Sequence, residues 1–299
     1  MCVLDYNIFN IRIYMTYPKM IFIVPYRNRE EQQHFFLHYM KYILEDINDE
    51  DYKIWFIHQC DERIFNRGAM KNIGFLAAKD TYPHDYLKIS YVFHDVDVVP
   101  YKKNMLTYQT IPGVVKHFYG FEYALGGIVS ILGIDFERVN GFPSYWGWAL
   151  EDNCLQKRCL QRYLKLDRDV FYKIGDHHIL HLFDELKKPY CNSNTRRYID
   201  DNGEDGISSI TSLHYINEHC MSAQNTSYTM IHVHAFEPYI SYKNERFTER
   251  RITDGNVLNV AKPIHKMKDT TPNVDATQST KPISRRVSSK TNKRSLTFL

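Results

Sequence analysis

The chain has 299 residues, of which 43% are hydrophobic and 24% charged, and this composition excludes fibrous and wholly disordered proteins. Six cysteines without a CxxC pair argue against both a disulfide-rich scaffold and a structural zinc ribbon. Residues 236–299 contain 13 basic and six acidic residues, whereas the preceding part contains 25 basic and 29 acidic ones. The net charge of +3 therefore arises from a basic C-terminal stretch and does not predict a specific nucleic-acid partner.

No segment approaches the roughly 20 consecutive apolar residues that span a bilayer, and polar residues interrupt the first 18 positions. We therefore expect no signal peptide, no transmembrane anchor and a cytoplasmic location. The richness in Ile, Tyr, Asn and Lys is typical of AT-rich coding, such as that of large DNA viruses, whose proteins are made in the host cytoplasm. We expect an N-terminal extension over 1–18, a folded domain over 19–240 and a basic, disordered tail over 241–299.

Strands and helices are predicted to alternate in the first third of the chain. Apolar runs indicate buried strands at Met20–Val24, Lys53–His58 and Ile89–Phe93. Apolar residues spaced by three and four indicate helices at Glu30–Ile47 and Arg67–Lys79. This alternation predicts an α/β fold with a parallel sheet and crossover helices. Because ligands gather at the carboxyl ends of such strands, polar residues that follow a strand are candidate site residues.

The rest of the chain is less regular. Gly113–Gly147 is rich in glycine and aromatic residues and is expected to be loop-like. A helix is predicted at Glu151–Tyr163, and short strands are predicted near Val170–Ile174, Ile179–Phe183 and Met230–Val233. The pattern fades after Phe236.

Asp95 and Asp97 follow the third predicted strand. Alternate side chains of a strand share a face, so both carboxylates can project together while Val96 points into the core. Two hard oxygen ligands at a strand end suit Mg²⁺ or Mn²⁺ bound to a diphosphate. An acidic turn that only ends the strand is the alternative interpretation.

Two tryptophans, Trp146 and Trp148, flank a glycine just before the acid pair Glu151 and Asp152. Such a segment is typical of a mobile sugar-binding lid, and a carboxylate beside it can accept a hydroxyl proton. The helix N-terminus would lower the pKa of that carboxylate, whereas burial would raise it, and the sequence leaves the balance open. Core tryptophans before an ordinary helix start are the alternative.

Histidines supply further candidate ligands. Three of them lie within five positions beside Asp176, namely His177, His178 and His181. A neutral imidazole is a suitable third protein ligand for Mn²⁺ or Zn²⁺. The pair His232 and His234 competes with them, and there we favour a strand with alternating exposure.

Arginine and amide side chains follow two of the predicted strands, within Tyr26–Arg29 and Phe65–Arg67. Guanidinium groups match phosphate oxygens, and an amide can bind the edge of a uracil. Solvated polar residues at helix starts are the alternative for each segment.

Taken in order, these segments resemble the β-1,4-galactosyltransferase family over about residues 19–235. The matching motifs are Phe22-Ile-Val-Pro-Tyr-Arg-Asn-Arg29, Ile64-Phe-Asn-Arg67, Asn72-Ile-Gly-Phe75, Val92-Phe-His-Asp-Val-Asp-Val-Val-Pro100, Gly126-Gly127, Asn140-Gly-Phe-Pro143, Tyr145-Trp-Gly-Trp148 with Glu151-Asp152, and Asp205-Gly206. The resemblance implies a GT-A-type fold with a mixed, mostly parallel sheet flanked by helices. It also implies inverting transfer of galactose from UDP-galactose to a sugar hydroxyl such as that of N-acetylglucosamine.

The resemblance further implies roles for individual residues. Asp152 would be the general base, with Glu151 and the lid residue Trp148 beside it. The cofactor, Mn²⁺ or Mg²⁺, would bind Asp97, His181 and His178. The UDP-sugar donor would contact Pro25, Arg27, Arg29, Phe65, Arg67, Asp95, Val96 and Gly127. A glycan or glycoprotein acceptor would contact Tyr145, Trp146, Glu151 and Asn153.

The chain departs from the family pattern at three places. Ala149-Leu150 stands where the lid has Gly-Gly, Asn153 where a further acid is usual, and Ala124-Leu125 where galactose-preferring members carry an aromatic pair. The last change leaves room for an N-acetylhexosamine, so UDP-GalNAc or another UDP-hexose is an alternative donor. The other two leave open a non-catalytic sugar- or nucleotide-binding relative. A metallophosphoesterase site at Asp176–His178 is a remote alternative that does not explain the tryptophan pair.

Overall fold

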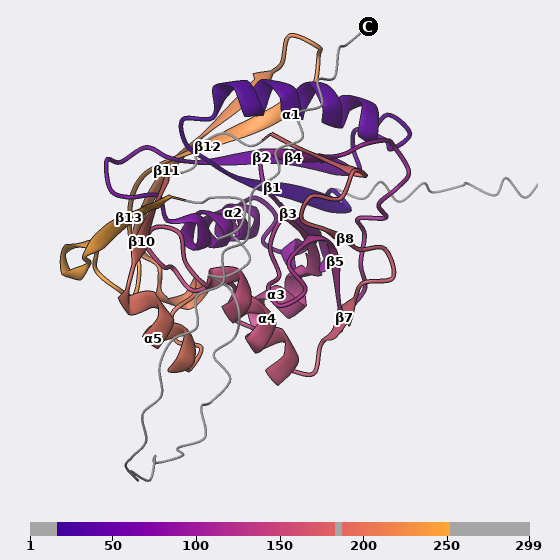
Figure 1. The fold of residues 1–299 in the computed structure, drawn as a ribbon. Coiled ribbons are helices and arrows are strands. Elements are labelled where there is room, and N and C mark those ends of the chain that lie inside the picture. The colour runs from indigo at the N-terminus through magenta and orange to yellow at the C-terminus, as the bar shows by residue number, and fades with distance from the viewer. Residues whose placement is uncertain (1–16, 183–186, 252–299) are drawn as a thin grey trace, which may run out of the picture. The chain divides into compact units, whose positions relative to one another are not determined.

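In the computed structural model, which describes residues 17–182 and 187–251, a nine-stranded sheet carries the fold (Figure 1). The strand order is β11-β12-β2-β1-β3-β6-β5-β7, and β8 pairs with β5. Four central strands run parallel: β1 (Met20–Tyr26), β2 (Tyr52–Gln59), β3 (Ser90–His94) and β12 (Ser227–Glu237). Antiparallel partners are β11 (Thr211–Met221) on β12 and β6 (Ile128–Leu132) on β3. The mixed, mostly parallel sheet expected from the sequence is confirmed.

The remaining elements are short. The other strands are β4 (Val98–Pro100), β5 (Val114–Gly120), β7 (Lys165–Asp167), β8 (Tyr172–Lys173), β9 (Ile179–His181), β10 (Lys187–Cys191) and β13 (Phe247–Arg251). The helices are α1 (Glu30–Ile43), α2 (Arg67–Thr81), α3 (Gly133–Arg138), α4 (Glu151–Gln161) and α5 (Ser193–Ile199), with single 3₁₀ turns at Tyr86–Lys88, Ile207–Ser209 and Tyr242–Asn244. Among the described residues, two further two-stranded antiparallel sheets form, β4 with β9 and β10 with β13.

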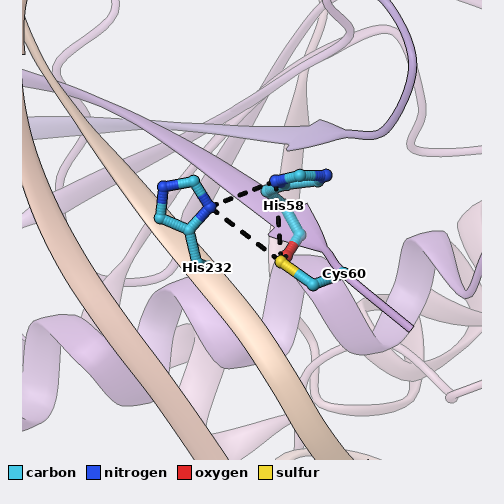
Figure 2. Close-up of side chains that lie close together, drawn as sticks. All are labelled: His58, Cys60 and His232. Atoms are coloured by element: carbon cyan, nitrogen blue, oxygen red, sulfur yellow. Dashed lines mark hydrogen bonds between the residues drawn. The ribbon is translucent and has the colours of Figure 1, made fainter.

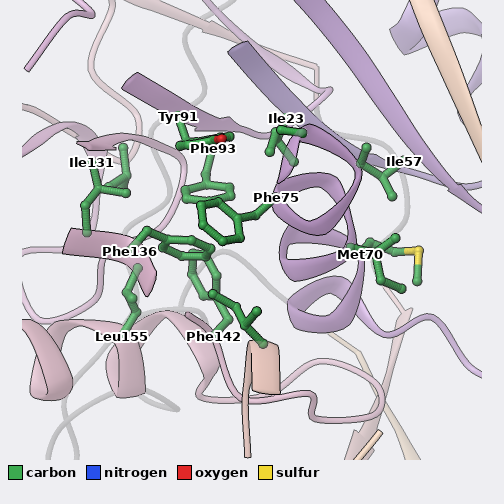
Figure 3. Packing of buried hydrophobic residues seen from close by; sticks show 14 of the residues in the cluster. Ile23, Ile57, Met70, Phe75, Tyr91, Phe93, Ile131, Phe136, Phe142 and Leu155 are labelled. Atoms are coloured by element: carbon green, nitrogen blue, oxygen red, sulfur yellow. The ribbon is translucent and has the colours of Figure 1, made fainter. Parts of the chain in front are cut away.

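Helices α1 and α2 cover opposite faces of the sheet (Figure 1). Alternate residues of β1 serve the two faces, as the strand period requires. Phe22 and Val24 belong to a core cluster with residues of α1, whereas Ile21 and Ile23 belong to one with residues of α2. Figure 3 shows the α2 side, where aromatic rings, among them Phe75, fill the space between the helix and β3. This packing fixes the N-terminus of α2 at the carboxyl edge of the sheet.

Several boundaries differ from the sequence-based expectation. Helix α1 ends at Ile43 and not at Ile47, because turns follow at residues 44–46. The segment 113–147 is not mainly loop, since it forms β5, β6 and α3. Ordered structure continues past residue 240, where β13 pairs with β10, so the expected tail cannot begin at 241.

Other expectations fall partly outside the described residues. Those include the N-terminal extension up to residue 16 and the tail from residue 252 onward. Among the residues that the structure does describe, none of the helices has the length and apolar character needed to cross a membrane.

Candidate active site

Arg67 is the first residue of α2, and its neighbour Asn66 holds it in place. The Asn66 side chain accepts a hydrogen bond from the Ala69 amide (2.9 Å), which caps the helix. Its amide group donates to the Ser144 carbonyl (3.0 Å), and its backbone amide donates to Gln59 Oε1 (2.8 Å) at the end of β2. The cap therefore ties the start of α2 to the sheet and to the loop that precedes α4.

The Arg67 guanidinium joins two acidic motifs that lie far apart in the sequence. Its Nη2 donates to Asp95 Oδ1 (2.7 Å), just after β3. Its Nη1 donates to Glu151 Oε1 (2.9 Å) and to Asp152 Oδ2 (2.6 Å), at the start of α4. Lys71, one turn along α2 and only 2% exposed, donates to Asp152 Oδ1 (2.9 Å). We call these five residues the Arg67 cluster.

The two neighbouring acids of this cluster differ in their affinity for a proton. Burial, and then the charge of Asp152, raises the pKa of Glu151. Burial also acts to raise the pKa of Asp152, but Arg67 and Lys71 outweigh it, and that pKa is lowered. The balance that the sequence left open is thus decided by two cations, and Asp152 is ionised at neutral pH.

Two glycines form the wall beside these acids. A Cβ at Gly126 would overlap Asp152 Oδ2, and a Cβ at Gly127 would overlap the Tyr119 carbonyl. Gly127 has a φ of +73°, in the left-handed region that favours glycine, and its carbonyl accepts a hydrogen bond from the Asp95 amide (3.0 Å). Glycine is therefore needed at both positions, because the backbone lies against Asp152 at Gly126 and against Asp95 at Gly127.

Asp97 and His181 face each other where β4 pairs with β9. Asp97 Oδ2 lies 3.8 Å from His181 Nε2, and the Tyr119 hydroxyl lies 2.9 Å from His181 Nδ1. Tyr119 therefore orients the ring with Nε2 toward the carboxylate, and this oxygen and nitrogen pair fits Mn²⁺ or Mg²⁺. His178, the third expected ligand, has its Nδ1 2.8 Å from Asp176 Oδ1. Two of the three expected ligands, Asp97 and His181, thus face each other, and the role of His178 stays a prediction.

The residues expected to contact the nucleotide line the ends of β1 and β2. Pro25 lies within β1, and Arg29 is the N-cap residue of α1. The Arg27 guanidinium lies over the Phe65 ring, 5.4 Å from its centroid, and donates to backbone carbonyls of the turn 61–63. An aromatic face and a guanidinium thus stand side by side at the edge of the sheet where Asp95 also lies.

The two tryptophans of the expected lid occupy different environments. Trp146 is 0% exposed, stacks on Phe236 with ring centroids 5.5 Å apart, and donates from Nε1 to the Ile240 carbonyl (3.0 Å). A ring held inside the core offers no face to an acceptor, so the predicted contact of Trp146 with an acceptor is wrong. Trp148 is half-buried, and its amide donates to the carbonyl of Pro189 in β10 (2.7 Å).

Three further expected contacts are placed as follows. Tyr145 is buried and lines a cavity of about 330 Å³ together with Asp205 and Tyr239. Asn153 donates to the Tyr123 carbonyl (3.1 Å). The side chain of Val96 is buried, as the strand alternation predicted, so it belongs to the core and not to the donor surface.

Two family models match the chain. The model described as the N-terminal region of glycosyl transferase group 7 matches residues 14–109, and the model described as the N-terminal domain of galactosyltransferase matches residues 114–182. The chain belongs to the β-1,4-galactosyltransferase family. The resemblance carried by the ordered motifs is therefore confirmed.

Curated members of the family align with about half of this chain. β-1,4-Galactosyltransferase 1 of Bos taurus is 32% identical over 160 residues, which is 50% of this chain and 38% of the relative. β-1,4-Galactosyltransferase 4 of Homo sapiens is 32% identical over 164 residues, which is 51% of this chain and 45% of the relative. The matched part of the chain thus spans less than half the length of these relatives.

A solved structure of a family member shares the fold. It is a variant of Drosophila β-1,4-galactosyltransferase 7 in complex with manganese, UDP-Gal and xylobiose. The TM-score is 0.60 at 21% sequence identity, and the match covers 73% of this chain and 94% of that chain. The GT-A-type fold expected for this β-1,4-galactosyltransferase family member is confirmed.

Two residues of the site were not singled out from the sequence, namely Lys71 and Tyr119. Lys71 follows Arg67 by four positions on a predicted helix, so the two share a face, and that spacing could have indicated a common partner. Asn66 was expected to offer its amide to the edge of a uracil, but in the structure its side chain caps α2 and donates to the Ser144 carbonyl. Tyr119 lies in the segment expected to be loop, and without a strand its direction could not be predicted.

Proposed function

We propose that this member of the β-1,4-galactosyltransferase family is a metal-dependent, inverting glycosyltransferase that moves galactose from UDP-galactose to a sugar hydroxyl. One observation carries the proposal. Arg67 links Asp95, at the carboxyl end of β3, to Glu151 and Asp152, at the start of α4. A nucleotide-sugar binds at strand ends in folds of this class, so an acid pair on the far side of Arg67 is placed to meet the acceptor.

Asp152 is the group that would take the acceptor proton. The acceptor oxygen forms a bond to the anomeric carbon while the bond from that carbon to the UDP oxygen breaks, and UDP leaves with the electron pair. The lowered pKa keeps Asp152 ionised, and Arg67 and Lys71 hold its carboxylate in one orientation. Glu151, whose pKa is raised, would bind the acceptor hydroxyls as a hydrogen-bonding partner.

Asp97 and His181 would hold the divalent cation, Mn²⁺ or Mg²⁺. Their facing donor atoms and the hydroxyl of Tyr119 on His181 Nδ1 support this assignment. When bound, the cation would neutralise negative charge on the departing diphosphate. The Drosophila relative with the same fold was crystallised with manganese and UDP-Gal.

The donor sugar has a second candidate. Ala124 and Leu125 are both buried and directly precede Gly126, which touches Asp152. Alanine is smaller than the aromatic residue that galactose-preferring members carry at this position, so UDP-GalNAc, with its acetamido group, is the alternative donor. A non-catalytic sugar- or nucleotide-binding relative is the alternative from another class, motivated by Ala149-Leu150 and Asn153.

A donor screen tests these proposals. The full chain is incubated with Mn²⁺, one of several UDP-sugars, and N-acetylglucosamine or xylose as acceptor, and both UDP release and glycoside product are measured. Product from UDP-galactose that requires acceptor and metal is the expected result. Product from UDP-GalNAc alone would favour the alternative donor, and UDP binding without product would favour the non-catalytic relative. A chain that neither binds UDP nor forms product would contradict the proposal.

A further inference from the structure

Three metal-binding side chains converge where β2 meets β12, outside the Arg67 cluster (Figure 2). His58 Nδ1 lies 3.2 Å from His232 Nδ1, and Cys60 Sγ lies 3.6 Å from His58 Nδ1 and 3.9 Å from His232 Nδ1. All three residues are half-buried, so an ion can reach them from solvent. We call them the histidine–cysteine cluster.

The three distances match one face of a zinc tetrahedron. With Zn–N of about 2.05 Å and Zn–S of about 2.3 Å, tetrahedral angles place two nitrogens about 3.4 Å apart and sulfur about 3.6 Å from each nitrogen. The observed separations of 3.2, 3.6 and 3.9 Å lie close to these values. We propose that His58, Cys60 and His232 bind a zinc-type transition-metal ion, with a fourth position open to water.

The surroundings of the cluster support a bound cation. Glu218 Oε2 lies 2.9 Å from His232 Nε2, on the side of the ring opposite the cluster. Metal-bound histidines commonly donate their second ring N–H to a carboxylate, which fixes the tautomer and the ring orientation. The ring of Tyr26 packs edge-on against His58, with centroids 5.3 Å apart, and so restricts the second imidazole.

The backbone also holds the ligands in place. His58 and His232 are direct partners in the parallel β2–β12 ladder, and the Cys60 amide donates to the Val233 carbonyl (2.9 Å). The three side chains therefore come from two paired segments whose register is set by hydrogen bonds. An ion bound here would fasten the β11–β12 hairpin to β2, where β12 joins the parallel part of the sheet.

The donor atoms distinguish this site from that at Asp97 and His181. Thiolate and imidazole select zinc-type ions, whereas carboxylate and water suit Mn²⁺ and Mg²⁺. The proposal does not rest on glycosyl transfer, because it concerns residues that take no part in the proposed reaction. Its test can therefore fail or succeed independently of the donor screen.

Cobalt substitution provides the direct test. Co²⁺ is titrated into the reduced full-length protein, and a thiolate-to-cobalt charge-transfer band together with tetrahedral d–d bands is expected at one equivalent. Cys60→Ser should remove the charge-transfer band and weaken Co²⁺ binding at least about 10-fold. Cys220→Ser, which alters another half-buried cysteine on β11, is the matched control and should leave the band intact. Absence of the band in the unaltered protein, or its persistence in Cys60→Ser, would overturn the proposal.

Thermal unfolding provides a second readout. Zn²⁺ at about 100 times its dissociation constant should raise the Tm by about 5 °C in the unaltered protein and in Cys220→Ser. The rise should vanish in His232→Ala, a variant whose folding is checked by its own cooperative unfolding. A rise of equal size in His232→Ala would place the bound ion elsewhere and contradict the assignment.

Discussion

The Arg67 cluster and the histidine–cysteine cluster lie at the same carboxyl edge of the sheet, but their charges are arranged differently. In the first, two cations stand against three carboxylates, and every contact joins opposite charges. In the second, three atoms with lone pairs face one another, and the Glu218 carboxylate contacts His232 from outside the group. The first arrangement holds the Asp152 carboxylate between two cations. The second has the geometry of a ligand set that gains most from a cation at its centre.

The largest expected effect is that of Asp152→Asn in the Arg67 cluster. The amide cannot accept the acceptor proton, so transfer should fall at least about 100-fold while UDP binding, measured by calorimetry, persists. Asp135→Asn is the control, because Asp135 is a buried carboxylate in α3 that accepts a hydrogen bond from the Gly113 amide (2.6 Å) away from the site. If Asp152→Asn retained turnover, the proposal that Asp152 is the general base would be contradicted.

Gly126→Ala tests whether the backbone positions that base. The added Cβ would overlap Asp152 Oδ2, so the carboxylate or the loop must move, and transfer should fall about 10- to 100-fold. Gly113→Ala is the control for backbone strain, because Gly113 has a φ of +82°, a left-handed conformation that Gly126 does not adopt, and open space around a Cβ. The control should cost about 1 kcal/mol of unfolding free energy and leave kcat near its usual value. Equal losses of kcat in both variants would show that strain, and not the contact with Asp152, is responsible.

Lys71→Met tests the charge balance of the cluster. One of the two cations that lower the pKa of Asp152 is removed while burial, which raises it, remains, so this pKa should rise. A lowered pKa stabilises the fold above the ordinary pKa of aspartate, and this stabilisation is lost as the pH falls through the pKa of the folded state. In the variant this stabilisation should be smaller and its loss should be complete at a higher pH, and the acidic limb of kcat/KM should also shift to higher pH.

The same variant should lower the free energy of unfolding by about 3 kcal/mol at neutral pH, because it breaks a buried ion pair. Lys79→Met is matched to it, since Lys79 lies on the same helix and pairs with Glu137 (2.7 Å) at an exposed position. That exposed pair should contribute less than about 1 kcal/mol. Denaturant titrations of both variants measure these losses of unfolding free energy. Equal losses would contradict the expectation that the buried ion pair contributes more than the exposed one.

Tyr119→Phe should shift the Mn²⁺ dependence of transfer to higher Mn²⁺ concentrations. Losing the hydroxyl on His181 Nδ1 leaves the ring less well oriented, so the apparent Mn²⁺ affinity should fall about 10-fold. Tyr91→Phe, which removes a hydroxyl that donates to the Tyr86 carbonyl (3.0 Å), is the control for the loss of a buried hydrogen bond. A Tyr119→Phe variant with unaltered Mn²⁺ dependence would argue against His181 as a ligand.

Glu218→Gln removes the negative charge that contacts His232 in the histidine–cysteine cluster. Of the substitutions considered, it is expected to have the smallest effect. The side chain is 63% exposed, so its contact with His232 Nε2 is screened by solvent. Co²⁺ affinity should fall by less than about 10-fold, and the charge-transfer band should keep its shape. A loss as large as that from Cys60→Ser would mean that Glu218 is itself a ligand.

The parts of this architecture that are periodic in sequence were predictable. β1, β2, β3 and α2 were expected within two residues of their observed ends, because their apolar residues are buried at regular spacing. β11 was not expected, because it is an edge strand whose side chains are mostly exposed and carry no alternating apolar pattern. The segment 113–147 failed as a prediction because its glycines and aromatic residues belong to short strands and a six-residue helix.

Most residues of the site could be identified from the sequence, but their arrangement in space could not. Asp95, Arg67 and the α4 acids were each identified, yet nothing local in the sequence shows that one guanidinium binds all of them. Trp146 was assigned to the acceptor because it belongs to the same Trp-Gly-Trp segment as Trp148. Gly147 lies between them with a φ of +78°, and one ring enters the core whereas the other remains half-buried. The histidine–cysteine cluster depends on the pairing of β2 with β12, which joins residues about 170 positions apart.

The hydrogen bonds of Asn66 connect three separate segments of the chain. One side chain and its amide join the end of β2, the first turn of α2 and the Ser144 carbonyl. The close approach of Gly68 to the Pro143 carbonyl strengthens the same junction. A displacement of the loop before α4 would therefore also move the helix turn that carries Arg67. Movement of Trp146 and Trp148 would then be coupled, through Asn66, to the orientation of Asp152, the proposed base.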